Sequence, residues 1–366
     1  MPSALFMLYR RFCNNLQCPK EGFVFRRPAA ACFALGAWLN RWCYRKGLFR
    51  EKKIPEVVVS VGNIVAGGSG KTQVVLKILE SIGQLRERSA ILSRGYRGKA
   101  SKKSHSLKVD LNNHTAVEVG DEPYLIGCRF PFVPVFIGKD RFKSAVLARR
   151  MRKSVLILDD GFQFRKLKKD FNILIVNGDD PFGGHQFIPR GRLRDFPDRL
   201  GEADLIVVNG SYDPILEEEL NSRTGVPKVF VQPVIDECRI PGTSVSERVC
   251  IENALVGVFC GLGNNQGFVS TVKRAGGRVV NEYFLPDHAR ISLKELKFFS
   301  AQTRNRGGEL LLCSEKDFVK IPHRWLLDES IMKIGVLRSK LQPVYNYEAF
   351  EILINRIKEK ERGLLL

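Results

Sequence analysis

The sequence contains no apolar run long enough to cross a bilayer, which takes about 20 residues. Its longest apolar stretch, Pro28 to Leu39, is about half that length and includes a proline and a glycine. The small-residue cleavage pattern of a secretory signal is also not convincing. We therefore expect a cytoplasmic protein without a membrane-spanning helix.

Clustered cysteines are missing as well. The nine cysteines are scattered and never form a CxxC pair, so the spacing supports neither a disulfide framework nor a zinc site. Unpaired thiols in a reducing compartment are the simpler interpretation.

Acidic residues are scarce in the first 55 positions, where Glu21 and Glu51 oppose eleven lysines and arginines. Aromatic and aliphatic side chains, such as Trp38 and Trp42, are interleaved with these cations. This mixture at helical spacing is typical of an amphipathic helix lying in a membrane interface. The alternative is a helix that packs on the protein's own core with a solvated basic face. The formal net charge of +20 favours anionic partners: nucleic acid, anionic lipid or a phosphorylated small molecule.

From residue 56 onward, short apolar runs alternate with helical patterns. Val75, Ile78, Leu79 and Ile82 recur at the spacing of one helix face. Such alternation predicts an α/β fold with a mostly parallel sheet, covered by helices on both faces. The expected strands are 57–61, 89–92, 133–137, 155–158, 172–176, 205–208 and 229–234. After a turn-rich polar stretch at 236–248, a second series is expected at 254–260, 278–284, 309–313 and 331–337.

A glycine-rich segment, GNIVAGGSGKT at residues 62–72, directly follows the first apolar run and precedes a helical pattern. A strand, a glycine-rich loop and a helix N-terminus in this order form a P-loop, in which backbone N–H groups and the helix dipole converge on phosphate oxygens. Lys71 is expected to reach the β- and γ-phosphates of a nucleotide, and the Thr72 hydroxyl is expected to bind Mg²⁺. The expected nucleotide-binding residues are Gly67, Gly68, Ser69, Gly70, Lys71 and Thr72.

Two adjacent carboxylates, Asp159 and Asp160, end another apolar run. In P-loop proteins a carboxylate at such a strand end holds the Mg²⁺ shell or orients a water. Asp-Asp-Gly after a strand is by itself more often a simple turn, so the interpretation depends on the P-loop about ninety residues earlier. Together the two motifs predict a Mg²⁺ site formed by Thr72, Asp159 and Asp160.

We therefore divide the chain into three parts. Residues 1–55 form a basic amphipathic membrane-associating segment, and residues 56–245 form a P-loop NTPase-type domain. Residues 250–366 form a second, smaller α/β domain. The length of 366 residues suits two domains that each bury a core.

Ten short motifs, in their order and spacing over about residues 3–320, resemble those of the tetraacyldisaccharide 4′-kinases of lipid A biosynthesis. They are VGNIVAGGSGKT (61–72), LSRGYRG (92–98), VGDEP (119–123), VFIGKDR (135–141), LDDGFQ (158–163), IPRGRLR (188–194), ADLIVVNG (203–210), FCGLGN (259–264), FLPDH (284–288) and SEKDFVK (314–320).

This resemblance implies transfer of the γ-phosphoryl group of ATP to the 4′-hydroxyl of a tetra-acylated glucosamine disaccharide 1-phosphate. It also implies that Asp121 is the catalytic base and that His288 supports it. From the residues alone, a turn-forming aspartate before a proline and a satisfied loop histidine are the simpler interpretations. A carboxylate–imidazole pair would orient the base and help to stabilise the transferred proton.

The implied lipid substrate carries acyl chains and a phosphate. An enzyme that acts on it is expected to dock on the anionic inner face of the cytoplasmic membrane, as a peripheral protein, through its N-terminal segment. The substrate phosphate requires cations, for which Arg190, Arg192 and Arg194 are the candidates. We expect no nucleic acid and no obligate protein partner.

Four positions depart from the motifs. Val65 stands where the general P-loop pattern has glycine, although the resembling family is similar in tolerating another residue there. Phe164 and Ala289 each replace a histidine of the family, and Arg190 stands where the family often has alanine. These last three departures concern the substrate pocket.

Two other functions would also use a P-loop. A P-loop NTPase that acts on nucleic acid would agree with the net charge of +20, but no RRM, KH or helix-turn-helix pattern is present. A regulatory GTPase or metallochaperone would need an NKxD motif, and the Asn209-Gly-Ser-Tyr segment lacks both the lysine and the aspartate.

Overall fold

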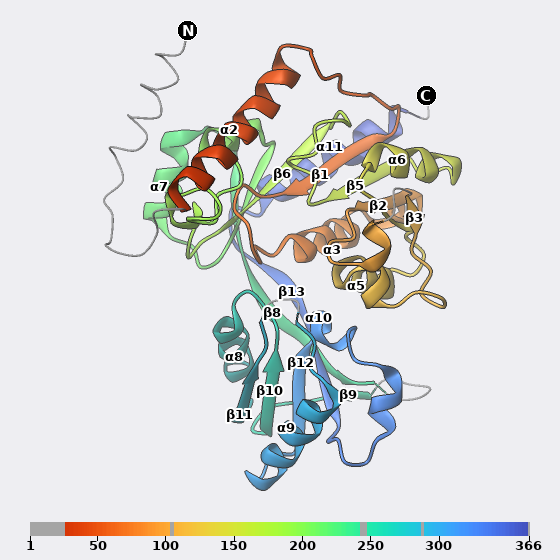
Figure 1. Ribbon diagram of the computed structural model, residues 1–366, viewed down its shortest axis with the longest axis vertical. Coiled ribbons are helices and arrows are strands. Elements are labelled where there is room, and N and C mark those ends of the chain that lie inside the picture. Colours follow the sequence, from red (N-terminus) through yellow and green to blue (C-terminus); the bar gives the residue numbers. More distant parts are fainter. Residues whose placement is uncertain (1–25, 103–105, 242–246, 287–288, 365–366) are drawn as a thin grey trace.

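A computed structural model describes residues 26–102, 106–241, 247–286 and 289–364 of the chain. Figure 1 shows two lobes joined by two long strands. Each lobe contains a parallel array of strands, and the two arrays are parts of one hydrogen-bonded sheet.

The upper lobe contains the first array, in the order β4-β2-β5-β1-β6-β7-β8, in which all neighbours are parallel. The short strand β3 (Leu107–Lys108) pairs antiparallel with β4 at the edge. The strands of the array are β1 (Val57–Gly62), β2 (Ser89–Ser93), β4 (Val135–Ile137), β5 (Val155–Asp159), β6 (Phe171–Asn177), β7 (Leu205–Asn209) and β8 (Lys228–Ile240).

Helices cover both faces of this array because its strands are apolar on both sides. Val57 and Val59 of β1 join a core with α3 (Lys71–Ser81), whereas Val58 between them joins a core with α6 (Arg141–Arg150). The expected parallel sheet, buried on both faces, is therefore confirmed.

The lower lobe contains the second array, in the order β11-β10-β12-β13, again with parallel neighbours. On one face α8 (Asn265–Arg274) packs through Val269 and Val272, and on the other α9 (Leu293–Asn305) packs through Leu296 and Phe299. The strands are β10 (Leu255–Cys260), β11 (Arg278–Phe284), β12 (Leu310–Ser314) and β13 (Ile334–Tyr345).

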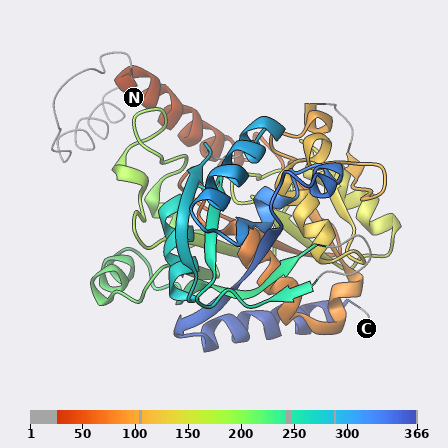
Figure 2. The ribbon, with the colours of Figure 1, turned by 90° about the horizontal axis from the view of Figure 1, so that it is seen from below.

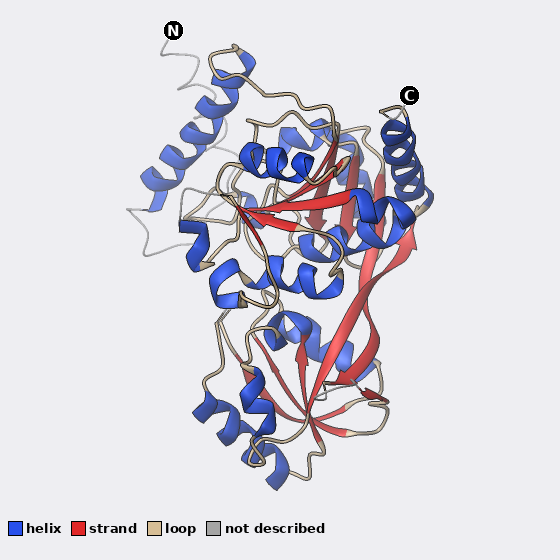
Figure 3. Cartoon of the chain, turned by 90° about the vertical axis from the view of Figure 1, so that its right-hand side faces the viewer, coloured by secondary structure: helices blue, strands red, loops and turns tan. Residues whose placement is uncertain are grey.

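The two arrays are joined by β8 and β13, the long strands that run between the lobes in Figure 3. Because β13 is antiparallel to β8, the carboxyl ends of the two parallel arrays face each other. The loops that follow β1, β5, β10 and β12 therefore lie between the lobes, where functional residues of parallel sheets are usually found.

The stretch 236–248 corrects the sequence interpretation, which treated it as turn-rich. Residues 236–240 continue β8, and Glu247–Val249 form β9, which pairs with β8. The polar residues fit a strand because their charges are paired across it. Asp236 binds Lys340 at 2.6 Å, and Glu237 binds Arg338 at 3.1 Å.

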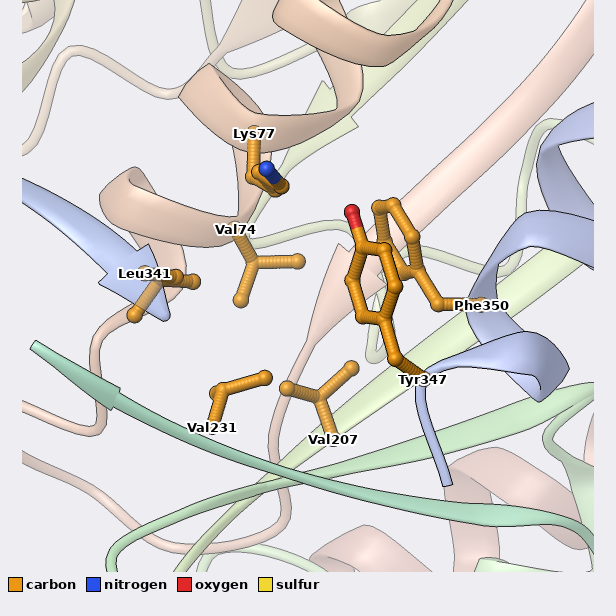
Figure 4. A pocket seen from close by; sticks show the side chains of 7 residues that line it. All are labelled: Val74, Lys77, Val207, Val231, Leu341, Tyr347 and Phe350. Carbon is orange, nitrogen blue, oxygen red and sulfur yellow. The ribbon is translucent and has the colours of Figure 1, made fainter. Parts of the chain in front are cut away.

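After β13 the chain returns to the upper lobe. Helix α11 (Glu348–Arg362) packs through Phe350, Leu353 and Ile357 on the core that contains β1 and α3, and it is the blue helix at the lower edge of Figure 2. The sequence-based division assigned all of residues 250–366 to the second domain, whereas α11 packs on the core of the upper lobe. Side chains of α3, β7, β8, β13 and the start of α11, among them Lys77 and Tyr347, line a cavity of only about 10 Å³ (Figure 4), which is too small to hold a nucleotide.

Helix α2 (Arg26–Arg45) is the described part of the predicted N-terminal segment, and residues 1–25 lie outside the described residues. Ala30 and Ala34 pack against a core formed with β6, β7 and α7 (Pro214–Arg223). In the part of the chain that the structure describes, no helix is long and apolar enough to span a membrane.

Candidate active site

The P-loop lies between β1 and α3, as expected. Gly70 precedes α3 with φ of 90°, a left-handed conformation that glycine adopts without strain. The Asn63 side-chain amide donates to the Ser69 hydroxyl at 2.8 Å, and the Asn209 amide donates to the Ser69 carbonyl at 3.2 Å. Residues 67–72 are thus anchored from two strand ends and form a cradle for phosphate at a helix N-terminus.

The departure at Val65 has a structural reason. Val65 forms an antiparallel bridge with Leu193, the Ala66 N–H donates to the Arg192 carbonyl at 2.6 Å, and the Arg194 N–H donates to the Ile64 carbonyl at 2.9 Å. The loop is therefore extended at this position, and extended backbone favours a β-branched side chain.

Asp160 faces the P-loop lysine. Its Oδ1 lies 3.8 Å from Lys71 Nζ, and Arg194 donates to both of its carboxylate oxygens, with Nη1 3.0 Å from Oδ2. Burial alone would raise the pKa of Asp160, but the Arg194 and Lys71 charges outweigh it and lower the pKa to about 2. Asp160 is therefore a carboxylate at neutral pH.

Asp159 has a different environment. Its side chain is buried, its Oδ2 accepts a hydrogen bond from Ser93 at 3.0 Å, and its Oδ1 has no hydrogen-bond partner among the described residues. Burial, with the nearby Glu122 and Asp160 charges, raises the pKa of Asp159 to about 7. A buried carboxylate oxygen without a donor is costly unless a cation balances it.

These residues fit Mg²⁺. In the described part of the chain no three or more His, Cys, Asp or Glu side chains form a metal cage. Mg²⁺ at phosphate-transfer sites does not need one, because one or two carboxylates, phosphate oxygens and waters complete its shell. The unpartnered Oδ1 of Asp159 and the carboxylate of Asp160, which lies 3.8 Å from Lys71, are oxygen ligands of the kind that this ion prefers.

Asp121 starts α5 (Asp121–Arg129) and is largely buried, with an exposed fraction of 8%. Across the lobes, Lys316 Nζ lies 4.0 Å from Asp121 Oδ2 and 3.5 Å from Glu122 Oε1. His288 lies outside the described residues, so its pairing with Asp121 stays a prediction.

The three candidate arginines lie in different surroundings. Arg194 binds Asp160 and also donates to the Asn63 Oδ1, so it lies beside the P-loop. Arg192 is exposed and pairs with Asp180. Arg190 is half-buried in the same segment.

Sequence reasoning missed Ser93, Asn63 and Lys316 as parts of this site. Each lies inside one of the ten motifs, which was the available signal. Their roles depend on which strand ends lie side by side, and the linear order of the motifs does not reveal that.

The comparisons with known proteins point to one family. The profile of the family described as tetraacyldisaccharide-1-P 4′-kinase matches residues 23–358. A tetraacyldisaccharide 4′-kinase of Chlamydia caviae is 40% identical over 365 residues, covering 99% of this chain and 98% of the relative. That of Elusimicrobium minutum is 33% identical over 337 residues, covering 88% and 89%. The crystal structure of LpxK from Aquifex aeolicus in complex with ATP superposes with a TM-score of 0.68 at 30% identity, covering 90% of this chain and 97% of that one.

Proposed function

This chain belongs to the tetraacyldisaccharide-1-P 4′-kinase family, and on that premise we propose how its residues divide the work of the reaction. It is an ATP-dependent kinase of lipid A biosynthesis that phosphorylates the 4′-hydroxyl of a tetra-acylated disaccharide 1-phosphate. The observation that carries the assignment of roles is the convergence of Lys71, Asp159 and Asp160 at the P-loop. The nucleic-acid and regulatory-GTPase alternatives are not favoured, because the family profile spans nearly the whole chain.

Residues 67–72 bind the phosphates of ATP. The backbone N–H groups of the loop and the N-terminus of α3 supply partial positive charge, and Lys71 adds a full charge toward the transferring phosphoryl group. Thr72, Asp159 and Asp160 would hold Mg²⁺, whose positive charge would offset that of the phosphate oxygens. Arg194 keeps Asp160 in place by contacting both of its oxygens.

Asp121 accepts the proton of the attacking 4′-hydroxyl. Asp121 lies in the upper lobe where it faces Lys316 of the lower lobe. This position between the lobes is compatible with the role. His288 orients Asp121 and shares the proton. A base positioned near the acceptor is what in-line transfer requires of the protein, because most of the catalysis is positioning and charge stabilisation.

Arg190 and Arg192 contribute cations for the 1-phosphate of the substrate. They lie in the segment whose backbone pairs with the P-loop at Val65, so a phosphate bound there stays close to the nucleotide. Arg194 follows them in the chain, but its contacts with Asp160 and Asn63 assign it to the nucleotide.

Helix α2 docks on the anionic inner face of the cytoplasmic membrane. Leu35, Trp38, Leu39 and Trp42 are exposed and follow the spacing of one helix face. Arg27, Arg45 and Lys46 lie on or next to the same helix and can contact lipid phosphates. An apolar helix face with flanking cations is the form of an interfacial helix, and it brings the enzyme to a substrate that lies in the bilayer.

The experiment is transfer of label from γ-labelled ATP to a detergent-dispersed tetra-acylated disaccharide 1-phosphate. Wild type is expected to label the lipid at the 4′-position, and Lys71→Ala is expected to lose activity by about a hundredfold or more. Asp121→Asn should lower kcat strongly with little change in ATP affinity, and adding His288→Ala should cost little more, because residues that act as one unit are not additive. Independent, multiplying losses would contradict the Asp121–His288 pair.

A further inference from the structure

A short helix of the lower lobe, α10 (Glu315–Phe318), lies against α5 of the upper lobe. Two consecutive residues of α10 make opposite charge pairs with the two ends of α5. Glu315 Oε2 is 2.6 Å from Arg129 Nη1 at the C-terminal end, and Lys316 Nζ lies near Asp121 and Glu122 at the N-terminal end. This double contact fixes both the position and the direction of α10 relative to α5.

The contact is not a loose surface pair. The side chain of Arg129 is 4% exposed and that of Lys316 is 17% exposed, so both charges are largely removed from water. A buried cation is stable only where anions surround it. Asp121 and Glu122 at the start of α5 supply carboxylates to which the Lys316 ammonium lies close.

Four carboxylates gather at this end of the site, namely Asp121, Glu122, Asp159 and Asp160. Burial is the main cause of the raised pKa of Asp159, and the nearby Glu122 charge raises it further. Asp160 pairs with Lys71 and Arg194. Carboxylates that lie close enough to affect one another's pKa repel each other when both are ionised. Lys71 balances the group from the P-loop side, and Lys316 balances it from the opposite lobe.

We propose that Lys316 is a positioning residue for phosphoryl transfer, whose ammonium group, supplied by the second lobe, holds the Asp121 carboxylate in place for the acceptor hydroxyl. Glu122 shares the ammonium, and the Arg129–Glu315 pair keeps α10 seated so that Lys316 reaches α5. This inference rests on the proposed role of Asp121. In this arrangement both lobes contribute side chains to the active site.

The test compares Lys316→Met and Lys316→Arg with wild type, measuring kcat on the lipid substrate and the Kd for ATP separately. Lys316→Met is expected to lower kcat at least tenfold with ATP affinity changed less than twofold, and Lys316→Arg is expected to recover most of the activity. The control is Lys297→Met, which removes a lysine of α9 from an ion pair with Asp328 at 2.6 Å in the lower lobe, and is expected to keep wild-type kcat. Lys316→Gln is made as well, because it keeps hydrogen-bond donors and is less disturbing to the fold. Wild-type kcat in folded Lys316→Gln or Lys316→Met would overturn the proposal.

The Asp121→Asn background separates this inference from the proposed function. If Lys316 acts through Asp121, then Lys316→Met should have little further effect on kcat in Asp121→Asn. A full additional loss would show that Lys316 acts elsewhere and would overturn the proposal. Wild-type activity of Asp121→Asn alone would instead remove the role of Asp121 as base. An impaired Asp121→Asn together with a fully active Lys316→Met would remove only the role of Lys316.

Discussion

Gly68 of the P-loop and Gly263 of the loop after β10 lie in direct contact. A Cβ atom on Gly68 would lie 3.6 Å from the Gly263 Cα, and one on Gly263 would lie 3.3 Å from the Gly68 nitrogen. Neither glycine has a positive φ, so the close approach of the two backbones, rather than a special conformation, is the reason for a small residue. The P-loop therefore touches the lower lobe.

A larger side chain at Gly263 should interfere with nucleotide binding. Gly263→Leu is expected to weaken ATP affinity about tenfold or more, equivalent to about 1.4 kcal/mol, because the side chain must displace the P-loop or separate the lobes. Gly225→Leu is the matched control, since a Cβ there meets nothing within 4 Å. Calorimetric titration with ATP measures both variants. Equal affinities would mean that the contact at Gly68 plays no part in binding.

The carboxylate pair after β5 should control the response to Mg²⁺. Asp159→Asn and Asp160→Asn are each expected to lower kcat and to raise the Mg²⁺ concentration needed for half-maximal rate, because each removes a charge from the metal shell. Asp179→Asn is the control, since Asp179 is exposed and also follows a parallel strand of the same sheet, β6. Wild-type Mg²⁺ titration curves for both site variants would reduce the pair to a structural turn.

Most of the strands and the P-loop could be predicted from the sequence because both depend on local patterns. Apolar runs such as 57–61 and 155–158 became β1 and β5, with ends within a residue of those expected. The double-aspartate turn could be linked to the P-loop because parallel strands bring their carboxyl ends to one edge.

What the sequence did not reveal depends on pairing between distant segments. Residues 236–240 look like a polar linker until Lys340 and Arg338 are placed opposite Asp236 and Glu237. In the same way, Lys316 reaches Asp121 only because β13 reverses the direction of the second array relative to the first. Hydrophobic periodicity reports local structure, so it predicts neither the pairing of these charges nor the direction of the second array.

Lys169 should make the stability of the fold depend on pH. Its ammonium is placed beside the ring of Phe162 and donates to the Phe162 carbonyl at 2.7 Å, and burial, with the Arg199 and Arg165 charges, lowers the pKa of Lys169 from 10.5 to about 7. Between pH 7 and pH 10.5 the unfolded chain holds a proton that the folded chain has released, so the free energy of unfolding rises with pH across this range. Lys169→Met, which cannot titrate, should reduce that rise.

Urea denaturation at pH 7 and at pH 9.5 measures the effect. The comparison is the change in unfolding free energy between the two pH values in wild type and in Lys169→Met. Lys168→Met is the control, since Lys168 is the neighbouring residue and its side chain is exposed. The same pH dependence in Lys169→Met as in wild type would show that the amine is not responsible.

The exposed face of α2 should hold the enzyme on membranes. Replacing Trp38 and Trp42, which stack on each other with ring centroids 6.4 Å apart, by serine removes two large apolar side chains from that face. Binding to vesicles that contain anionic lipid is expected to fall at least tenfold, because each buried aromatic contributes on the order of 1 kcal/mol or more to interfacial partitioning. ATP affinity should not change, because both side chains lie on the exposed face of α2, whereas the P-loop lies between β1 and α3.

Salt and a matched variant separate the apolar part of binding from the ionic part. High salt should weaken but not abolish vesicle binding of wild type, because screening acts on the cations and not on the apolar face. It should release the Trp38→Ser/Trp42→Ser variant almost completely. The control carries Phe132→Ser and Phe298→Ser, two exposed apolar residues of which the second lies on α9 in the lower lobe, and should bind vesicles like wild type. If the control detaches and the α2 variant stays bound, the membrane surface lies elsewhere on the molecule, and the basic helix α6, with Arg149 and Arg150 in its last turn, becomes the next candidate.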